Sequence, residues 1–286
     1  MTSGRINTVR DALNAASLIF NCVENPQKEA VLLMAHVLKT DIAYVYSKMD
    51  ESIKENQYKD FIEKCLERNS GTPFQYITGD SEFMSLNFKV NKNVLIPRPE
   101  TEFLVDQGLV FLKTRKHLGK QRVLDLCTGS GCVAVSIAKN FENCEIVAVD
   151  VSEEALVIAK ENSELNLVQD RIAFVKSDLF SELTGKFDLI VCNPPYIKSE
   201  EIDDLQAEVQ MEPRIALDGG ADGYDFYRRI AEKAFDFLLD DGGIILELGI
   251  GQDEIVQSIF KNQRFYNKNF FLIRDYAKII RTLTIY

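Results

Sequence analysis

The stretch Val123-Leu124-Asp125-Leu126-Cys127-Thr128-Gly129-Ser130-Gly131 joins an apolar run to a glycine turn. Residues 123–127 predict a buried strand, and a helical pattern follows the turn as far as Ala138. A glycine turn at the end of a strand brings backbone N–H groups and a helix N-terminus toward a ligand. The stretch therefore predicts a strand–turn–helix unit with a ligand site at its turn.

The chain beyond this unit continues to alternate between strand and helix patterns. These patterns predict strands at 145–150, 172–175, 187–192 and 243–248, helices at about 223–239 and 254–260, and a closing hairpin at 269–273 and 278–285. Such alternation is typical of a doubly wound, mostly parallel α/β sheet. We expect residues 99–286 to form this domain.

Residues 1–70 are predicted to form a separate helical bundle. An apolar stripe fits one helical face, and Asn25-Pro26 gives a second helix a cap and a proline at its first position. No catalytic pattern accompanies these helices, so structural support or recognition of a partner is the expected role. The stripe consists of Val9, Leu13, Ala16, Phe20 and Val23.

Residues 71–98 are predicted to connect the two domains through a β-hairpin. Residues 84–90 predict a strand, Asn91-Lys92-Asn93 a turn, and residues 94–96 the returning strand. The hairpin leads into Pro97-Arg98-Pro99-Glu100-Thr101-Glu102, where the prolines stiffen the chain and Thr101 is expected to cap the next helix. An arginine and two carboxylates could also face a ligand here, but their spacing alone favours a simple helix start.

The composition indicates a globular protein of about two domains. The 286 residues are 46% apolar and 27% charged, and the net charge of −11 suits nucleic-acid phosphates poorly. The apolar runs are too short to span a bilayer, so we expect a cytoplasmic monomer with no membrane or direct nucleic-acid partner. The six cysteines form no Cys-x-x-Cys pair, and we expect them to be reduced, mostly buried and not part of a metal site.

An acidic residue at the end of the second strand extends the predicted ligand site. Asp150 lies roughly 20 residues after Gly129, and its carboxylate can accept hydrogen bonds from ribose hydroxyls. Together with Gly131 and Ala134 these residues satisfy the NAD fingerprint, so a dehydrogenase is one hypothesis. S-adenosylmethionine is favoured because Asp125 could meet its methionine ammonium. In addition, no His or Lys suited to hydride chemistry lies near the fourth strand.

The tetrapeptide Asn193-Pro194-Pro195-Tyr196 follows the fourth strand of this domain. Two prolines cannot continue a strand ladder, so we expect a stiff loop at the ligand-binding edge of the sheet. The Asn193 side-chain oxygen and the Pro194 carbonyl could accept the two hydrogens of a planar amide or aromatic amine. Pro195 and Tyr196 could pack on that flat group. Methylation of such a nitrogen is the favoured chemistry, and a plain loop of turn-forming residues is the alternative.

With these motifs the chain resembles the bacterial protein-(glutamine-N5) methyltransferases of the HemK/PrmC type, which modify class-1 peptide-chain release factors. The resemblance covers nearly the whole chain, and the Pro97–Glu102 run is its most specific part. The motifs are Gln75-Tyr76-Ile77-x-Gly79, Ile96 to Glu102, Asp125 to Gly131, Asn193 to Ile197, and Glu212-Pro213 followed by Ala216-Leu217-x-Gly219-Gly220-x-Asp222-Gly223.

The resemblance implies a seven-stranded, Rossmann-like methyltransferase domain at 99–286. It also implies a helical substrate-recognition domain at 1–70 and a hairpin connector at 71–98. The implied cofactor is S-adenosyl-L-methionine, which leaves as S-adenosyl-L-homocysteine. The implied substrate is the glutamine in the Gly-Gly-Gln loop of the release factor.

The resemblance further implies roles for single residues. Asp150 would bind the ribose, Asp178 and Leu179 would flank the adenine, and Asn193 and Pro194 would hold the glutamine amide while Tyr196 packs on it. The implied cofactor-binding residues are Asp125, Thr128, Gly129, Ser130, Gly131, Asp150, Asp178, Leu179 and Asn193. The implied substrate-binding residues are Asn193, Pro194, Pro195 and Tyr196, of which Asn193, Pro194 and Tyr196 would be catalytic. Cys127 departs from the pattern, because many members of the wider fold carry a glycine there.

Two further classes compete with these hypotheses. A DNA N6-adenine methyltransferase would share the Asn-Pro-Pro-Tyr motif, but it would need a flipped base and a basic groove. The acidic composition and the lack of a separate base-reading domain count against it. A catalytically silent binding protein is the other class.

Overall fold

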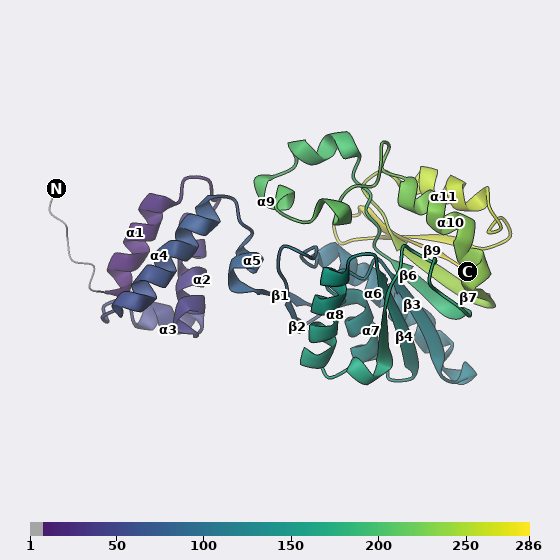
Figure 1. Cartoon of the computed structure of the whole chain (residues 1–286), viewed down its shortest axis with the longest axis horizontal. Helices are drawn as coiled ribbons and strands as arrows, with labels where there is room; N and C mark the ends of the chain where they lie inside the picture. Colours follow the sequence, from purple (N-terminus) through teal and green to yellow (C-terminus); the bar gives the residue numbers. More distant parts are fainter. Residues whose placement is uncertain (1–7) are drawn as a thin grey trace. The chain divides into compact units, whose positions relative to one another are not determined.

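The computed structural model describes residues 8–286, which form two compact units (Figure 1). One unit extends to Gly79 and includes Gln206–Met211, and the other comprises Asp80–Leu205 and Glu212–Tyr286. The first seven residues of the predicted helical bundle lie outside the described residues. Within residues 8–286, no helix has the length and apolar character needed to span a membrane.

The first unit is a helical bundle, as its apolar stripe predicts. Thr8 and Asp11 form a capping box that opens the first helix, and Asn25 accepts the Lys28 N–H at the start of the second. Of the predicted stripe, every member except Val23 is buried. The helices are α1 (Val9–Ile19), α2 (Pro26–Leu38), α3 (Ile42–Ser47), α4 (Glu55–Asn69), α5 (Phe74–Thr78) and α9 (Ala207–Gln210).

A small hairpin of β1 (Asp80–Phe83) and β2 (Leu86–Lys89) opens the second unit. Its position corrects the predicted one, because the turn lies at Met84-Ser85. Within the described part of the chain, residues 94–96 do not form a strand. Met84 and Ser85 have φ of 51° and 58°, a left-handed conformation that neither residue type favours. The sequence therefore carries no signal for this turn. Residues 94–96 are held instead by Glu212, which accepts the Ile96 N–H at 3.0 Å.

Among residues 8–286, seven strands form the main sheet in the order β5-β4-β3-β6-β7-β9-β8. Neighbours pair in parallel from β5 to β7, whereas β9 pairs antiparallel with both β7 and β8. This arrangement confirms the expected α/β fold. The strands are β3 (Gln121–Leu126), β4 (Cys144–Asp150), β5 (Ile172–Lys176), β6 (Phe187–Cys192), β7 (Leu238–Glu247), β8 (Phe270–Arg274) and β9 (Ile280–Ile285).

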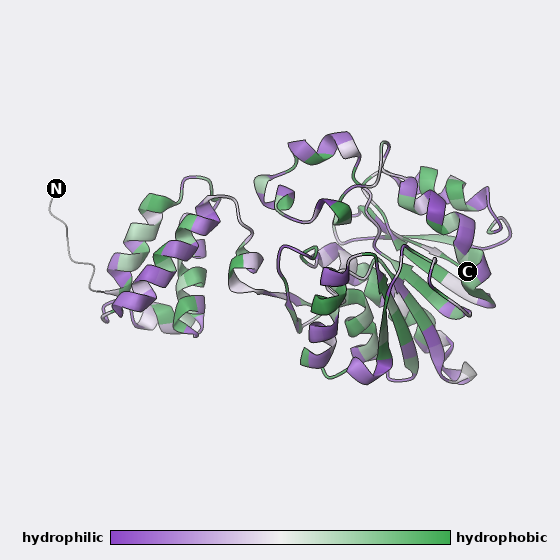
Figure 2. Ribbon diagram, viewed as in Figure 1, coloured by the Kyte–Doolittle hydropathy of each residue, from purple (hydrophilic) through white to green (hydrophobic). Residues whose placement is uncertain are grey.

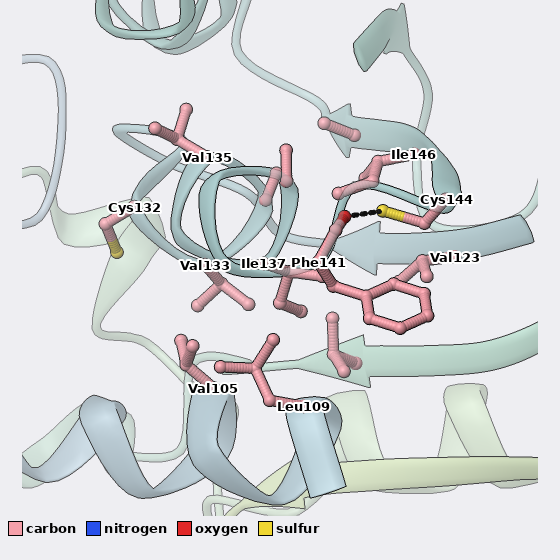
Figure 3. Packing of buried hydrophobic residues seen from close by; sticks show 14 of the residues in the cluster. Val105, Leu109, Val123, Cys132, Val133, Val135, Ile137, Phe141, Cys144 and Ile146 are labelled. Atoms are coloured by element: carbon pink, nitrogen blue, oxygen red, sulfur yellow. Dashed lines mark hydrogen bonds between the residues drawn. The ribbon is translucent and has the colours of Figure 1, made fainter. Parts of the chain in front are cut away.

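Helices cover both faces of this sheet, and the central strands are mostly hydrophobic (Figure 2). Val133 and Ile137 of one helix pack toward Val105 and Leu109 of another on the same face (Figure 3). One face carries α6 (Glu102–Thr114), α7 (Cys132–Asn140) and α8 (Glu153–Leu165), and the other carries α10 (Asp225–Phe237) and α11 (Asp253–Lys261).

A buried asparagine of α8 ties the hairpin to the glycine turn. The Asn162 side-chain oxygen accepts the Lys89 N–H at 2.6 Å, and its Nδ2 donates to the carbonyls of Lys89 and Ser130 at 3.0 and 2.9 Å. Its side-chain oxygen and nitrogen therefore both bond to backbone groups, two in the hairpin and one in the glycine turn. The bond to the Ser130 carbonyl fixes the position of the glycine turn relative to α8.

Two glycines in the turn offer a matched test of this packing. Gly129 and Gly131 both have positive φ, but a Cβ at 129 would meet nothing within 4 Å, whereas one at 131 would lie 3.0 Å from the Ala159 Cβ. We expect Gly129→Ala to cost about 1–2 kcal/mol of backbone strain. Gly131→Ala should cost that amount plus about 1–3 kcal/mol of overpacking against α8. Urea unfolding measures both free energies, and equal losses would contradict the close contact.

Candidate functional site

The register of the parallel strands places four residues in one row across the sheet. Leu126 lies opposite Val149 and Cys192, and Cys192 lies opposite Leu246. The next residue along each strand therefore reaches the same edge of the sheet. These residues are Cys127, Asp150, Asn193 and Glu247.

A cavity opens at this edge and contains most of the predicted site. The predicted residues that line it are Asp125, Thr128, Gly129, Ser130, Asp150, Asp178, Leu179, Asn193 and Pro195. Gly131, Pro194 and Tyr196 lie outside its lining. Gly131 is the N-cap of α7, and Pro194 is buried. Arg98, for which the sequence favoured a simple helix start, also lines the cavity. Lining residues to which the sequence analysis gave no ligand-binding role include Leu95, Thr101, Ser177, Ile215 and Phe226.

Asp125 is fully buried at the start of the turn. Its Oδ2 accepts the Thr128 hydroxyl at 2.6 Å and the Ala134 N–H at 3.2 Å. Burial raises the pKa of Asp125 to about 7, and these two hydrogen bonds oppose the shift. The Asp125 carboxylate thus occupies the Ala134 N–H, one of the helix N-terminal donors to which a phosphate typically binds.

Asp150 connects the glycine turn to the start of α8. Its two carboxylate oxygens accept the N–H groups of Gly129 and Ser152, each at 2.9 Å. Burial raises the Asp150 pKa despite these bonds. A carboxylate offers about four lone-pair sites, so acceptor capacity remains on the cavity side.

Cys127 adopts a backbone conformation that suits a glycine. Its φ is 58°, in the left-handed region, and it lines the cavity. A residue with a side chain is strained there by about 1–2 kcal/mol. This strain gives a physical reason for the glycine that many members of the wider fold carry at this position.

The Asn193 side chain points its nitrogen toward the start of α6. Asn193 Nδ2 donates to the Thr101 Oγ1 at 3.1 Å. Thr101 is the N-cap residue of α6, as predicted, but its side chain makes no capping hydrogen bond to the helix. The Thr101 hydroxyl instead accepts from Asn193. Asn193 directly follows the end of β6, which brings its side chain to the start of α6.

The loop after Asn193 is held by a second segment of the same unit. Ile197 N–H donates to the Leu217 carbonyl at 3.0 Å, and Gly219 N–H donates to the Ile197 carbonyl at 2.7 Å. A Cβ on Gly219 would lie 2.7 Å from the Tyr196 Cα, so only glycine permits this approach. Gln252 Nε2 donates to the Tyr196 carbonyl at 3.0 Å. The loop is therefore held by hydrogen bonds both from the 217–219 segment and from Gln252.

The Tyr196 ring is half-buried beneath this loop. Burial raises the pKa of Tyr196 to about 12, so the phenol stays neutral near pH 7. A neutral phenol offers an apolar ring face and one polar end. Its placement suits support of the loop, although it does not line the cavity.

The charged residues of the Pro97–Glu102 run do more than start a helix. Arg98 lines the cavity and forms an ion pair with the buried Glu212. Glu100 lies 3.4 Å from the Arg281 guanidinium, and the Glu102 carboxylate accepts the Met84 N–H at 2.8 Å. The sequence signal for these contacts was three charged residues in a segment stiffened by prolines. Their spacing alone did not show which partners they contact.

Glu247 was missed because it directly follows the apolar run of Ile244, Ile245 and Leu246 at the end of β7. Only 2% of the residue is exposed. Burial raises the pKa of Glu247 to about 7, with hydrogen bonding by Thr101 and Asn193 favouring the charged form. Among residues 8–286, no group of His, Cys, Asp and Glu has an arrangement that could hold a metal ion.

Comparisons with known proteins place these features in context. Residues 11–79 match a family described as the PrmC N-terminal domain, and residues 102–269 match the Methyltransferase small domain. A release factor glutamine methyltransferase of Thermodesulfovibrio yellowstonii is 42% identical over 89% of this chain and 88% of its own. One from Clostridium acetobutylicum is 35% identical over 96% and 97%.

A solved structure supports the fold independently of close sequence similarity. The hMettl16 catalytic domain, in complex with MAT2A 3′UTR hairpin 6, matches with a TM-score of 0.57 at 16% identity. The match covers 81% of this chain and 82% of that one. At this identity the likeness concerns the fold alone.

The raised pKa of Asp125 predicts a specific dependence of stability on pH. Between its ordinary value of 3.8 and its folded value of about 7, the folded state binds more protons at this group than the unfolded state does. Its contribution to stability is therefore present at low pH and is lost as the pH rises through 7. Asp125→Asn, which can still accept from Thr128 and Ala134, removes this term.

We expect the stability of the wild type relative to Asp125→Asn to fall between pH 5 and pH 8. Urea unfolding of both proteins across that interval measures the difference. The other carboxyl groups are common to both proteins, so their contributions largely cancel. A difference that does not change with pH would contradict the assigned burial of an ionisable Asp125.

Proposed function

The chain belongs to the family of release factor glutamine methyltransferases, and on this premise we propose its reaction. It is a methyltransferase that acts on protein glutamine, and the proposed donor is S-adenosylmethionine. The proposed acceptor is the side-chain amide nitrogen of the glutamine in the Gly-Gly-Gln loop of class-1 release factors. The observation that carries the proposal is a single cavity lined by Asp125, Asp150 and Asn193.

The charges around the cavity favour a cationic cofactor over a dinucleotide. A dinucleotide places its pyrophosphate at the glycine turn and the helix N-terminus. Here the Asp125 carboxylate takes the Ala134 N–H of α7 and adds a negative charge beside it. A phosphate would meet like charge there, whereas the ammonium and sulfonium of S-adenosylmethionine would meet opposite charge. The residues present therefore fit S-adenosylmethionine and disfavour the dehydrogenase hypothesis.

The residues that would hold this cofactor follow from the cavity lining. Asp125 would face the methionine ammonium, Asp150 the ribose hydroxyls, and Asp178 and Leu179 the adenine. Gly129 and Ser130 let the backbone approach closely. When bound, S-adenosylmethionine supplies an electrophilic methyl group on its sulfonium.

The chain's own contribution to the reaction is positioning. A glutamine amide nitrogen is a weak nucleophile because its lone pair is delocalised into the carbonyl. We propose that the Asn193 Oδ1 and the Pro194 carbonyl each accept one amide hydrogen, which fixes the amide plane and polarises the nitrogen. Pro195, which lines the cavity, would pack on the flat group, and Tyr196 would support the loop that carries it. No strong general base is needed if the proton leaves after methyl transfer.

The helical unit is proposed to recognise the release factor. Within the described residues of that unit, the helices bring together an apolar core and no group of His, Cys, Asp and Glu that could hold a metal ion. We further propose that the enzyme acts as a monomer in the cytoplasm. The net charge of −11 argues against nucleic acid as its substrate.

The proposed reaction is tested by mass spectrometry of a purified class-1 release factor after incubation with the enzyme and S-adenosylmethionine. We expect one added methyl group, on the peptide that contains the Gly-Gly-Gln glutamine. A release factor with that glutamine replaced by alanine is the control. Methylation of both proteins, or of neither, would reject the assigned substrate residue.

Asp150→Ala tests the proposed ribose contact. Loss of a charge-assisted hydrogen bond should weaken S-adenosylmethionine binding by roughly 1.5–3 kcal/mol, that is, about tenfold or more. Titration calorimetry measures the affinity. Glu153→Ala is the matched control, because this nearby carboxylate is exposed and pairs with Lys176. Equal affinities for the folded Asp150→Ala and Glu153→Ala proteins would remove Asp150 from the cofactor site.

Asn193→Ala tests the proposed amide acceptor. Removing one preorganised partner of this kind should slow methyl transfer by about 10²–10³ while sparing cofactor affinity. Asn193→Asp should also be slow, because it adds a carboxylate near both the sulfonium and the buried Glu247. Single-turnover rates at saturating S-adenosylmethionine measure the effect. A rate for Asn193→Ala within a few-fold of wild type would exclude a catalytic role for this side chain.

A further inference from the structure

The two ends of an asparagine amide have nearly the same shape, so only neighbouring groups decide which end faces a ligand. At Asn193 the neighbours are a hydroxyl and a carboxylate. Asn193 Nδ2 donates to the Thr101 Oγ1 at 3.1 Å. Glu247 follows Leu246, the strand partner of Cys192, so its carboxylate lies beside Asn193, and both Asn193 and Thr101 favour its charged form. In its charged form the carboxylate only accepts, so it attracts the nitrogen end of the amide. These contacts leave the Asn193 Oδ1 on the other side.

Glu247 is an unusual residue for its place in the fold. It follows the buried run of Ile244, Ile245 and Leu246 at the end of β7, where another apolar residue would continue the packing. Burying a carboxylate costs free energy unless it is fully hydrogen-bonded. Among residues 8–286, its Oε2 and the hydroxyl of Thr282, directly opposite on β9, are both buried without a hydrogen-bond partner. The fold alone therefore gives no reason for this carboxylate.

The charges near Glu247 do not form a simple ion pair with it. Arg281 favours its charged form and Glu100 disfavours it. The Arg281 guanidinium is itself engaged by Asp275 at 2.8 Å and by Glu100 at 3.4 Å. The uncharged side chains that favour its charged form are Thr101 and Asn193.

We propose that Glu247 and Thr101 are positioning residues that hold the nitrogen end of Asn193 and turn its oxygen toward the acceptor amide. This inference rests on the proposed amide methylation for its consequence, but the held orientation is a property of the free protein. Thr101 can accept from Asn193 and donate to Glu247 at the same time, because a hydroxyl has one hydrogen and two acceptor sites. The three side chains come from the start of α6, the end of β6 and the end of β7, so they join three elements at the cavity.

The held orientation also explains why Asn193 is suited to an amide substrate. A flipped Asn193 would present its NH₂ group to the NH₂ of the acceptor, and two donors would then face each other. With the orientation fixed beforehand, the acceptor meets an oxygen without reorganisation of the site. Glu247 and Thr101 thus act on the reaction through Asn193 and not by touching the reacting atoms.

The orientation is tested directly by NMR of protein labelled with ¹⁵N-asparagine. The Asn193 side-chain amide signal is identified by its disappearance in Asn193→Ala. Thr101→Val keeps the shape of the side chain and removes the hydroxyl, and Thr101→Ser restores it. We expect faster hydrogen exchange and a shifted signal for the Asn193 NH₂ in Thr101→Val, and near wild-type behaviour in Thr101→Ser. An unchanged Asn193 signal in Thr101→Val would overturn the proposal, whether or not the enzyme methylates a release factor.

Kinetics then test the consequence for the reaction. Single-turnover methylation at saturating S-adenosylmethionine should be about 10–100-fold slower in Thr101→Val, as for other residues that orient a functional side chain, with cofactor affinity unchanged. In an Asn193→Ala background the same substitution should have no further effect, because the residues act as one unit. An equal loss in both backgrounds would indicate a merely structural role and would overturn the proposal.

Glu247→Gln separates positioning from stability. Removing a buried charge should leave the free energy of unfolding at pH 8 unchanged or increased, whereas the rate should fall about tenfold or more because the new amide can compete for Thr101. A stable Glu247→Gln enzyme with the wild-type rate would remove Glu247 from the proposal. If wild-type enzyme fails to methylate any class-1 release factor, the proposed function fails, and the NMR result still decides the orientation.

Discussion

The register of four parallel strands is the constraint on which the site depends. Because Leu126 lies opposite both Val149 and Cys192, and Cys192 lies opposite Leu246, the next residue of each strand reaches the same edge. If one strand shifted by a single residue, each of its side chains, including the one at the site, would move to the other face of the sheet. The apolar cores on both faces resist such a shift. The packing that stabilises the fold therefore also aligns Asp150, Asn193 and Glu247.

This alignment gathers negative charge at a poorly solvated edge. Burial raises the pKa of Asp125 and of Glu247 to about 7, and it raises the pKa of Asp150. The neighbouring cations are already engaged, since Arg98 pairs with Glu212 and Arg281 pairs with Glu100 and Asp275. A cationic ligand would thus relieve an electrostatic cost that the protein alone leaves in place. The same charges oppose a pyrophosphate or a nucleic-acid backbone.

Sequence patterns predicted the central sheet well because its strands are short, mostly apolar runs between turn signals. The 187–192 prediction coincides with β6 (Phe187–Cys192), since the prolines that follow mark its end. The hairpin was misplaced because its turn uses Met84 and Ser85 with positive φ, which their side chains do not signal. The hydrogen bond between Thr101 and Asn193 was not predicted because the two residues are distant in sequence. Long-range side-chain contacts of this kind leave no local pattern.

The contacts that hold the Asn-Pro-Pro-Tyr loop matter because the proposed nucleophile is weak. A delocalised amide nitrogen gains little from a base. The protein can therefore contribute most by fixing, before the substrate binds, the groups that orient the acceptor amide. The Asn-Pro-Pro-Tyr loop meets this need through its prolines, through backbone bonds of Ile197 with Leu217 and Gly219, and through Gln252 at the Tyr196 carbonyl. Those contacts fix the backbone but leave the asparagine amide free to flip. Thr101 and Glu247 supply the remaining constraint, and a carboxylate that never donates when charged is the group best able to hold one end of that amide.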